Sequence, residues 1–251
     1  MTAAPDLAKD RVLLEVCVDT PAGLAAAIAG GADRIELCAA LGLQGLTPAP
    51  GLMALAASAP IPIYPIIRPR NGDFCYDARD LDAMRHDIDA VRHHGLAGVS
   101  IGANRPDGEL DLDVLEKLVE HARGLGMTLH RSFDFVADQA AALEAAIALG
   151  FERVLTSGGA LTALAGAEHL AQLVAQADGR IRILAGAGVR ANNVAELVRR
   201  TGVREVHGSF SGPLPSANPT SRLVTMGFMP AEMRDTDQQA VAQVVGILRA
   251  L

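Results

Sequence analysis

The sequence predicts a single (β/α)8 barrel, or TIM barrel, an α/β fold in which eight parallel strands alternate with helices. Short apolar segments alternate with amphipathic ones along the chain, which is typical of a parallel sheet. Eight such units fill 251 residues, and roughly 30 residues is the length of one βα repeat with short loops. No Gly-x-Gly-x-x-Gly motif follows the first apolar segment, which disfavours an open dinucleotide-binding sheet.

The eight expected strands are short and mostly aliphatic. They are LLEVCV (13–18), RIELC (34–38), IYPIIRP (63–69), GVSIGA (98–103), TLHRSFD (128–134), RVLTSG (153–158), RIRILAGAG (180–188) and EVHGS (205–209). The segments between them have helical periodicity, as in the stripe formed by Leu81, Met84, Ile88 and Val91. Gly31 and similar glycines stand shortly before strands, where a helix C-terminal cap is expected.

We expect one domain over residues 1–251, with residues 1–11 as an N-terminal tail. Residues 211–236 break the alternation with a long connection rich in Pro, Ser and Asn. Long loops that follow barrel strands lie over the active-site face and are often functional. This connection is therefore a candidate lid, and a C-terminal extension packed outside the barrel is the alternative.

Composition argues against several classes of protein. The net charge is −7 and aromatic residues make up 3% of the chain, which disfavours nucleic-acid binding. No apolar stretch approaches the roughly 18 residues of a membrane span, and the N-terminus does not resemble a signal peptide. Three cysteines in 251 residues do not form a disulfide framework. We expect a cytoplasmic protein with reduced thiols and no membrane partner.

Polar residues gather at the carboxyl ends of the expected strands, where barrel enzymes carry their active sites. Alternate residues of a strand share a face, so Glu15 should point with Cys17, and Glu36 with Cys38. The candidate catalytic residues are Glu15, Glu36, Arg68, His130, Asp134 and His207. Ion pairs of Glu15 and Glu36 with Arg68 are the structural alternative, because buried charges are rarely unpaired.

Two kinds of chemistry are open to this cluster. His130 with Asp134, or with a glutamate, could perform acid–base catalysis. Glu15, Glu36, His130 and His207 could instead hold a divalent metal. A Schiff-base mechanism is disfavoured, because the chain's lysines are Lys9 in the tail and Lys117 on an expected helix.

The two strand cysteines suggest a soft metal. Cys17 and Cys38 end neighbouring strands, which lie about 5 Å apart in a sheet, and a pair of thiolates favours Cu(I). No Cys-x-x-Cys spacing indicates a four-ligand zinc site. The alternative for each cysteine is a small buried apolar residue. Cys75, after the third strand, could add a thiol near the mouth or lie on the surface.

An anion site is also expected at the barrel mouth. Arg68 and Arg70 project from one strand, and guanidinium groups bind carboxylate or phosphate in a bidentate manner. Glycine-rich turns follow the seventh and eighth strands, at Gly186, Gly188 and Ser209. Loops at these two positions commonly bind phosphate through backbone N–H groups, although glycine also serves tight turns.

The series EVCV, GADRIELC, GLTP, IRPRNGDFCY, HRSFD, LTSGG, GAGV and VHGS, in this order over about residues 12–210, resembles the CutC family, which is named for copper homeostasis. The resemblance implies a (β/α)8 barrel, a cytoplasmic location and a homodimer or larger homo-oligomer. It also implies a Cu(I) site at two cysteines, which fall on Cys17 and Cys38, and it carries no accepted enzyme activity. Gln44 and Ser132 depart from the family's usual GGLTPS and FHRAFD motifs without removing a candidate ligand.

Two functions follow from these observations, and whether the protein is an enzyme stays open. The first is copper homeostasis, with Cu(I) held by Cys17 and Cys38. The second is an uncharacterised barrel enzyme that applies acid–base chemistry to a small anionic substrate bearing phosphate or carboxylate. A copper buffer does not require two arginines, a histidine–aspartate pair and anion-binding loops, whereas an enzyme does not require two neighbouring cysteines.

Overall fold

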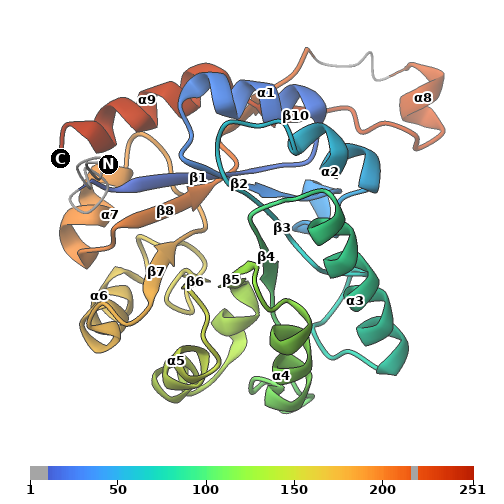
Figure 1. The fold of residues 1–251 in the computed structure, drawn as a ribbon. Coiled ribbons are helices and arrows are strands. Elements are labelled where there is room, and N and C mark those ends of the chain that lie inside the picture. The colour runs from blue at the N-terminus through green and yellow to red at the C-terminus, as the bar shows by residue number, and fades with distance from the viewer. Residues whose placement is uncertain (1–10, 216–219) are drawn as a thin grey trace, which may run out of the picture.

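The computed structural model describes residues 11–215 and 220–251 as an eight-stranded parallel barrel surrounded by helices (Figure 1). The barrel strands are β1 (Leu13–Val18), β2 (Arg34–Leu37), β3 (Ile63–Pro65), β4 (Gly98–Ile101), β5 (Gly126–Leu129), β6 (Arg153–Thr156), β7 (Arg182–Ala185) and β8 (Glu205–Gly208). Their order in the sheet is β3-β2-β1-β8-β7-β6-β5-β4. The predicted TIM-barrel fold is confirmed.

Backbone contacts between β3 and β4 bring the two ends of this sheet together. Ile66 and Ser100 form a parallel bridge just beyond β3. The N–H of Ile67 donates to the carbonyl of Ser100 at 2.8 Å, and the N–H of Ala97 donates to the carbonyl of Ile63 at 3.1 Å. All eight strands therefore direct their carboxyl ends to the same side of the barrel.

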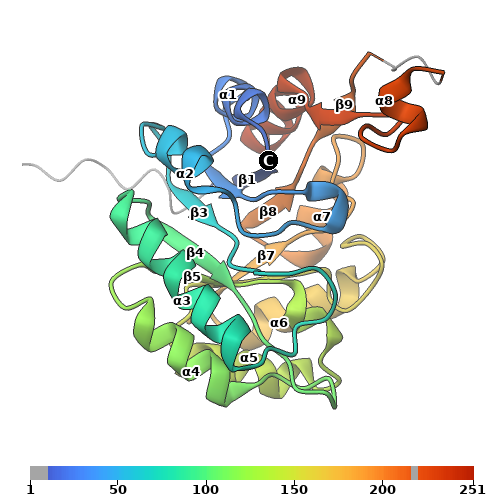
Figure 2. The ribbon, with the colours of Figure 1, turned by 90° about the vertical axis from the view of Figure 1, so that its right-hand side faces the viewer.

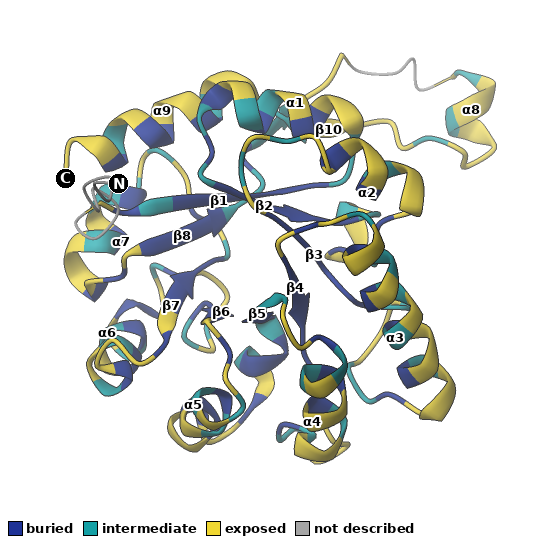
Figure 3. Cartoon of the chain, viewed as in Figure 1, coloured by how far each residue is buried: buried dark blue, intermediate teal, exposed yellow. Residues whose placement is uncertain are grey.

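Helices cover the outside of the barrel and bury their apolar stripes against it (Figure 3). They are α1 (Pro21–Gly30), α2 (Pro50–Ala56), α3 (Ala78–His93), α4 (Leu112–His121), α5 (Gln139–Ala148), α6 (Ala167–Ala177), α7 (Val194–Thr201) and α9 (Gln238–Arg249). The predicted stripe on α3 is confirmed, because Leu81, Met84, Ile88 and Val91 are all buried. Gly31 caps α1 with a φ of 92°, as its position after the helix predicts. No helix in the described part of the chain is long and apolar enough to cross a membrane.

The segment predicted as the fifth strand, residues 128–134, is only partly extended. β5 ends at Leu129, and Arg131–Phe135 form a 3-10 helix, η2. His130 is the N-cap of η2, and its Nδ1 accepts a hydrogen bond from the N–H of Ser132 at 3.2 Å. The extended prediction beyond Leu129 is therefore wrong, because a local cap replaces the strand ladder.

The long connection after β8 forms a small antiparallel ribbon. β9 (Ser211–Pro213) pairs with β10 (Arg234–Thr236), and α8 (Arg222–Thr225) lies between them outside the ring of helices (Figure 2). The hydroxyl of Thr20 donates to Asp235 at 2.8 Å, which ties β10 to the start of α1. Residues 216–219 of this candidate lid, and residues 1–10 of the expected tail, lie outside the described residues.

Buried ion pairs fill the barrel interior near the amino ends of the strands. Arg34 pairs with Glu15 and with Glu205, and Arg153 pairs with Glu205 at 3.3 Å. Both guanidinium groups lie over the ring of Tyr64, at 5.6 Å and 4.8 Å from its centroid. We call Glu15, Arg34, Arg153 and Glu205 the interior ion-pair layer.

Candidate metal and substrate site

A cavity of about 750 Å³ lies at the carboxyl ends of the barrel strands. Cys17, Glu36 and His207 contribute to its lining from β1, β2 and β8. The loops after β3, β5 and β7 add Phe74, Arg131 and residues 187–190. Pro230 and residues 232–236 of the long connection line it too. The cavity therefore occupies the position where barrel enzymes hold their substrates.

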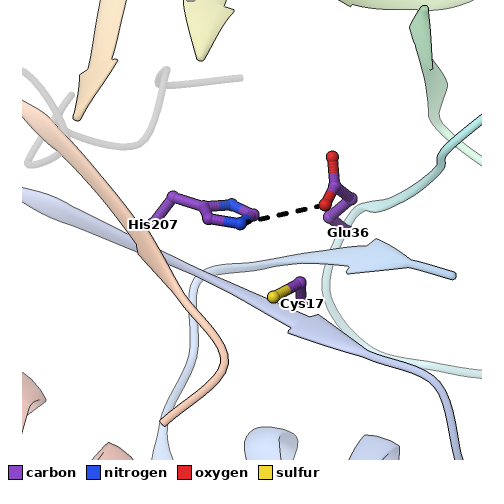
Figure 4. A group of neighbouring side chains, drawn as sticks. All are labelled: Cys17, Glu36 and His207. Carbon is purple, nitrogen blue, oxygen red and sulfur yellow. Dashed lines mark ion pairs between the residues drawn. The ribbon is translucent and has the colours of Figure 1, made fainter. Parts of the chain in front are cut away.

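Cys17, Glu36 and His207 form a compact group of potential ligands in this cavity (Figure 4). One donor atom from each lies within 4.8 Å of the other two, and all three residues are buried. Cys17 stands opposite Glu36 in the pairing of β1 with β2. His207 stands opposite Glu15 in the pairing of β1 with β8, so adjacent strands deliver the three side chains to one inward face.

Glu15 orients the imidazole of His207. Its Oε1 lies 2.7 Å from Nδ1 of His207, and its Oε2 accepts a hydrogen bond from Arg34. Nε2 of His207 then faces Glu36, whose Oε2 lies 3.8 Å away. Burial raises the pKa of Glu15, but Arg34 and His207 outweigh it and hold that pKa well below its usual range. The anionic Glu15 thus fixes the ring that reaches the cavity.

The pKa values of His207 and Glu36 are both raised, for different reasons. Burial lowers the pKa of His207, but Cys17, Glu15 and Glu36 outweigh it and raise the pKa well above its usual value. Burial raises the pKa of Glu36, and Glu15 adds to this, while His207 opposes it. His207 and Glu36 therefore bind their protons tightly, and a cation that these two residues ligate must displace them.

Cys38 has a different environment from Cys17. Its sulfur donates to the carbonyl oxygen of Val18 at 3.3 Å, and it is not a member of the compact ligand group. Burial raises the pKa of the Cys38 thiol, and Cys17 and Glu36 add to the shift. Cys75 is half-buried and lies outside the cavity lining. The structure thus groups Cys17 with Glu36 and His207, and Cys38 lies close enough to Cys17 for the two thiols to influence each other.

The two predicted anion-binding arginines are engaged by the protein itself. Arg68 donates to the carbonyls of Leu43, Gly45 and Gly72 at 2.8–3.0 Å. These bonds hold the loops after β2 and β3, and among the described residues no ion pair links Arg68 to Glu15 or Glu36. Glu15 pairs with Arg34 instead.

Arg70 also has protein partners. It pairs with Asp80 at 2.9 Å and with Asp73 at 3.1 Å, and it lies outside the cavity lining. The expectation that Arg68 and Arg70 project together from one strand is not met, because β3 ends at Pro65.

His130 lines the cavity, but Asp134 is not among its lining residues, and the two do not bond to each other in the described part of the chain. Asp134 accepts hydrogen bonds from Arg131 at 2.7 Å and from the N–H of Ser157 at 3.0 Å, which anchors η2 to the end of β6. The ring of His130 packs 4.9 Å from that of Phe74. Burial, aided by Arg68, lowers the pKa of His130 to about 3, so the ring is neutral.

The predicted glycine-rich loops do lie at the cavity, and Gly188 and Ser209 line it. Gly186 packs against the barrel interior, since a Cβ there would lie 2.6 Å from the side chain of Leu155. Two residues of this region, Arg34 and Arg190, were not predicted from the sequence. Arg34 could have been predicted, because it stands two residues before Glu36 and alternate residues of a strand share a face.

These features define a (β/α)8 barrel protein with a thiol, an imidazole and a carboxylate gathered in one large cavity. A sequence profile described as the CutC family matches residues 12–212, and the chain belongs to the CutC family. A CutC family protein of Caulobacter vibrioides is 73% identical over 241 residues, covering 96% of this chain and 98% of that protein. A CutC family protein of Sinorhizobium medicae is 55% identical over 242 residues, with the same two coverages of 96% and 98%.

A solved structure is similar as well. A crystal structure from Streptococcus agalactiae, provisionally described as the copper homeostasis protein CutC, has a TM-score of 0.76 at 30% sequence identity. The similarity covers 79% of this chain and 98% of that one. The shared barrel therefore spans nearly the whole of the streptococcal protein.

Proposed function

We propose that this protein takes part in copper homeostasis by binding Cu(I) at the mouth of the barrel. Cys17 and Nε2 of His207 are the main ligands in this proposal, and Glu36 is the third donor. One observation carries it, namely that these three buried donors from neighbouring strands lie within 4.8 Å of one another. The description of the streptococcal relative as a copper homeostasis protein supports the choice of metal.

The donor set fits a metal ion. Two metal–ligand bonds of about 2.0–2.3 Å each span at most about 4.6 Å, so small side-chain rotations would close the 4.8 Å group on one ion. A thiolate and an imidazole suit a soft or borderline metal such as Cu(I). Glu15 holds Nδ1 of His207, which is the usual arrangement of a carboxylate behind a histidine ligand.

The proposal is tested by anaerobic Cu(I) titration against a competing chelator. Cys17→Ser and His207→Asn should each weaken binding at least about tenfold. Cys75→Ser is the matched control and should leave binding unchanged, since Cys75 lies outside the cavity lining. Cys38→Ser decides the ligand set, because a loss as large as that of Cys17→Ser would mean that Cys38 leaves Val18 to complete a two-thiolate site. Equal affinity in all four variants would refute the proposal.

A second candidate function is acid–base catalysis on a small anionic substrate. The cavity of about 750 Å³ that favours it is far larger than one ion requires and has the size of a small-molecule site. Its lining includes Arg190 and His130, and Nε2 of His130 has no hydrogen-bond partner among the described residues. A raised pKa at His207 beside Glu36 is also typical of an acid–base pair.

We also propose, from the family resemblance, that the protein is a cytoplasmic homodimer or larger homo-oligomer. Analytical ultracentrifugation tests the assembly, and a single species at the 26.1 kDa monomer mass across a wide concentration range would refute it. Cell fractionation tests the compartment.

A further inference from the structure

We propose that the loop after β7, together with Arg190, is a phosphate-binding subsite that takes the phosphate group of a small phosphate monoester. This inference rests on the second candidate function and specifies its substrate class. The relevant residues are 187–190, all of which line the cavity beside Ser209.

The backbone of this loop presents unpaired donors. Ala187 and Gly188 are consecutive left-handed residues, with φ values of 77° and 71°. Among residues 11–215 and 220–251, the N–H groups of Ala187, Gly188 and Val189 donate to no protein acceptor. Successive N–H groups in such a loop form a concave nest that binds anions. Alanine is disfavoured at a φ of 77°, so the conformation must be held by surrounding contacts.

Asn193 is one of the residues that hold the loop. Its Oδ1 accepts a hydrogen bond from the N–H of Arg190 at 2.8 Å, and its Nδ2 donates to the carbonyl of Gly188 at 2.9 Å. On the other side, the N–H of Ala163 donates to the carbonyl of Ala187 at 2.9 Å. Two of these bonds occupy carbonyl groups of the loop and one occupies the N–H of Arg190, so the N–H groups of Ala187, Gly188 and Val189 stay without a protein acceptor among the described residues. Asn193 is thus a positioning residue for the subsite.

Arg190 differs from the other arginines that line the cavity. Arg68 donates to three carbonyls, Arg131 pairs with Asp134, and Arg234 donates to Ser211. Within the described part of the chain, the guanidinium of Arg190 has no hydrogen bond or ion pair. An exposed cation next to three unpaired N–H groups is the local arrangement that an anion needs.

The number of donors favours phosphate over carboxylate. Three N–H groups and a forked guanidinium can serve the three terminal oxygens of a phosphate monoester, whereas a carboxylate has two. The loops after the seventh and eighth strands are also where barrels frequently bind phosphate. The geometry of this loop therefore selects a phosphate group.

The rest of the ligand would lie against an apolar wall of the same cavity. Phe74 and Phe135 both line it, with ring centroids 5.8 Å apart, and Phe135 is 66% exposed. An exposed aromatic ring in a cavity offers a surface for the carbon skeleton of an ester. Phe135→Ala should therefore weaken binding of a sugar phosphate more than binding of inorganic phosphate.

The experiment is isothermal titration calorimetry with inorganic phosphate, ribose 5-phosphate and malonate on the parent, Arg190→Gln and Asn193→Ala. Arg199→Gln is the matched control, because Arg199 is an exposed arginine of α7 outside the cavity. We expect both phosphate compounds to bind the parent at least tenfold more tightly than malonate does. Arg190→Gln should reduce this affinity at least tenfold and Arg199→Gln by less than twofold.

Several outcomes overturn the inference. The first is an equal loss of phosphate affinity in Arg190→Gln and Arg199→Gln. The second is tighter binding of malonate than of the phosphate compounds by the parent, and the third is no phosphate binding to the parent. Asn193→Ala should weaken phosphate binding, and because it could also disturb folding, Arg190→Gln decides the case.

Two further measurements separate this inference from the proposed functions. Cys17→Ser should still bind phosphate, and Arg190→Gln should still bind Cu(I). Phosphate binding without turnover of any monoester would refute the enzyme while leaving the subsite intact. Turnover that survives Arg190→Gln with an unchanged KM would refute the subsite alone.

Discussion

The interior ion-pair layer and the Cys17–Glu36–His207 group lie inside the same barrel, yet they satisfy their charges differently. In the layer, Arg34 pairs with two carboxylates, and Arg153 pairs with Glu205. In the ligand group, the ion pair of Glu36 is long, with its Oε2 lying 3.8 Å from Nε2 of His207. Buried charges with close partners are costly to separate, whereas a buried carboxylate with a long ion pair at a cavity is available to bind something else.

The largest effect on stability is expected when Arg34 of the interior ion-pair layer is replaced. Arg34→Met leaves Glu15 and Glu205 buried without their main partner, and uncompensated buried charges cost about 3–5 kcal/mol. We expect the free energy of unfolding, measured with urea, to fall by that amount. Arg180→Met is the control, because its ion pair with Glu144 is exposed and should be worth at most about 1 kcal/mol. Equal effects of the two variants would contradict the structural role of the layer.

The buried, neutral ring of His130 should make the stability of the protein depend on pH. The folded protein holds the pKa of His130 at about 3, against 6.5 for the unfolded chain. The unfolded chain therefore gains the proton first as pH falls, so the stability due to the neutral ring is present above pH 6.5 and is lost toward pH 3.

Between pH 6.5 and 5, the parent should lose about 1.6 kcal/mol more than His130→Asn, because the two proteins share their other titrating groups. The asparagine can keep the hydrogen bond from Ser132 but does not titrate. Urea unfolding at the two pH values measures the difference, and parallel pH profiles of the two proteins would show that His130 is not buried in the neutral form.

Glu36→Gln should change the free energy of unfolding in the opposite direction from Arg34→Met. Burial raises the pKa of Glu36, so its charged form destabilises the folded protein at neutral pH. We expect the neutral glutamine to raise the free energy of unfolding by about 1 kcal/mol and to weaken Cu(I) binding. A loss of stability instead would place Glu36 with the structural charges.

The smallest expected effect concerns the loop after β7. Ala187 has a φ of 77°, which glycine adopts without strain, so Ala187→Gly should stabilise the protein by about 0.5 kcal/mol. Differential scanning calorimetry can detect the small rise in Tm. A lower Tm would mean that the methyl group of Ala187 contributes packing that outweighs the strain.

Much of the fold was predictable because it depends on local patterns. The alternation of apolar strands with periodic helices predicted the barrel, and the stripe of α3 was confirmed. Strand alternation also predicted that Cys17 and Glu36 would face the interior, since each stands two residues from another candidate. These inferences need only neighbours in the sequence.

The remaining features depend on partners that are distant in the sequence. Nothing in His130–Asp134 indicates that Asp134 bonds to Ser157, so a 3-10 turn was mistaken for a strand. Arg68 binds carbonyls of Leu43, Gly45 and Gly72, and backbone acceptors leave no mark in a sequence. The hydrogen bond from the Cys38 thiol to the carbonyl of Val18 has the same origin.

Glu15 joins the two charged regions, because one oxygen bonds to Arg34 and the other to His207. Ligand binding in the cavity is therefore linked thermodynamically to the stability of the interior ion-pair layer. A ligand that displaces the proton of His207 weakens one of the two bonds that hold this carboxylate. Glu15 lies on β1 and its other partner, Arg34, lies on β2, so the local stability of both strands should change. Amide hydrogen exchange in those two strands thus becomes a remote readout of what the cavity holds.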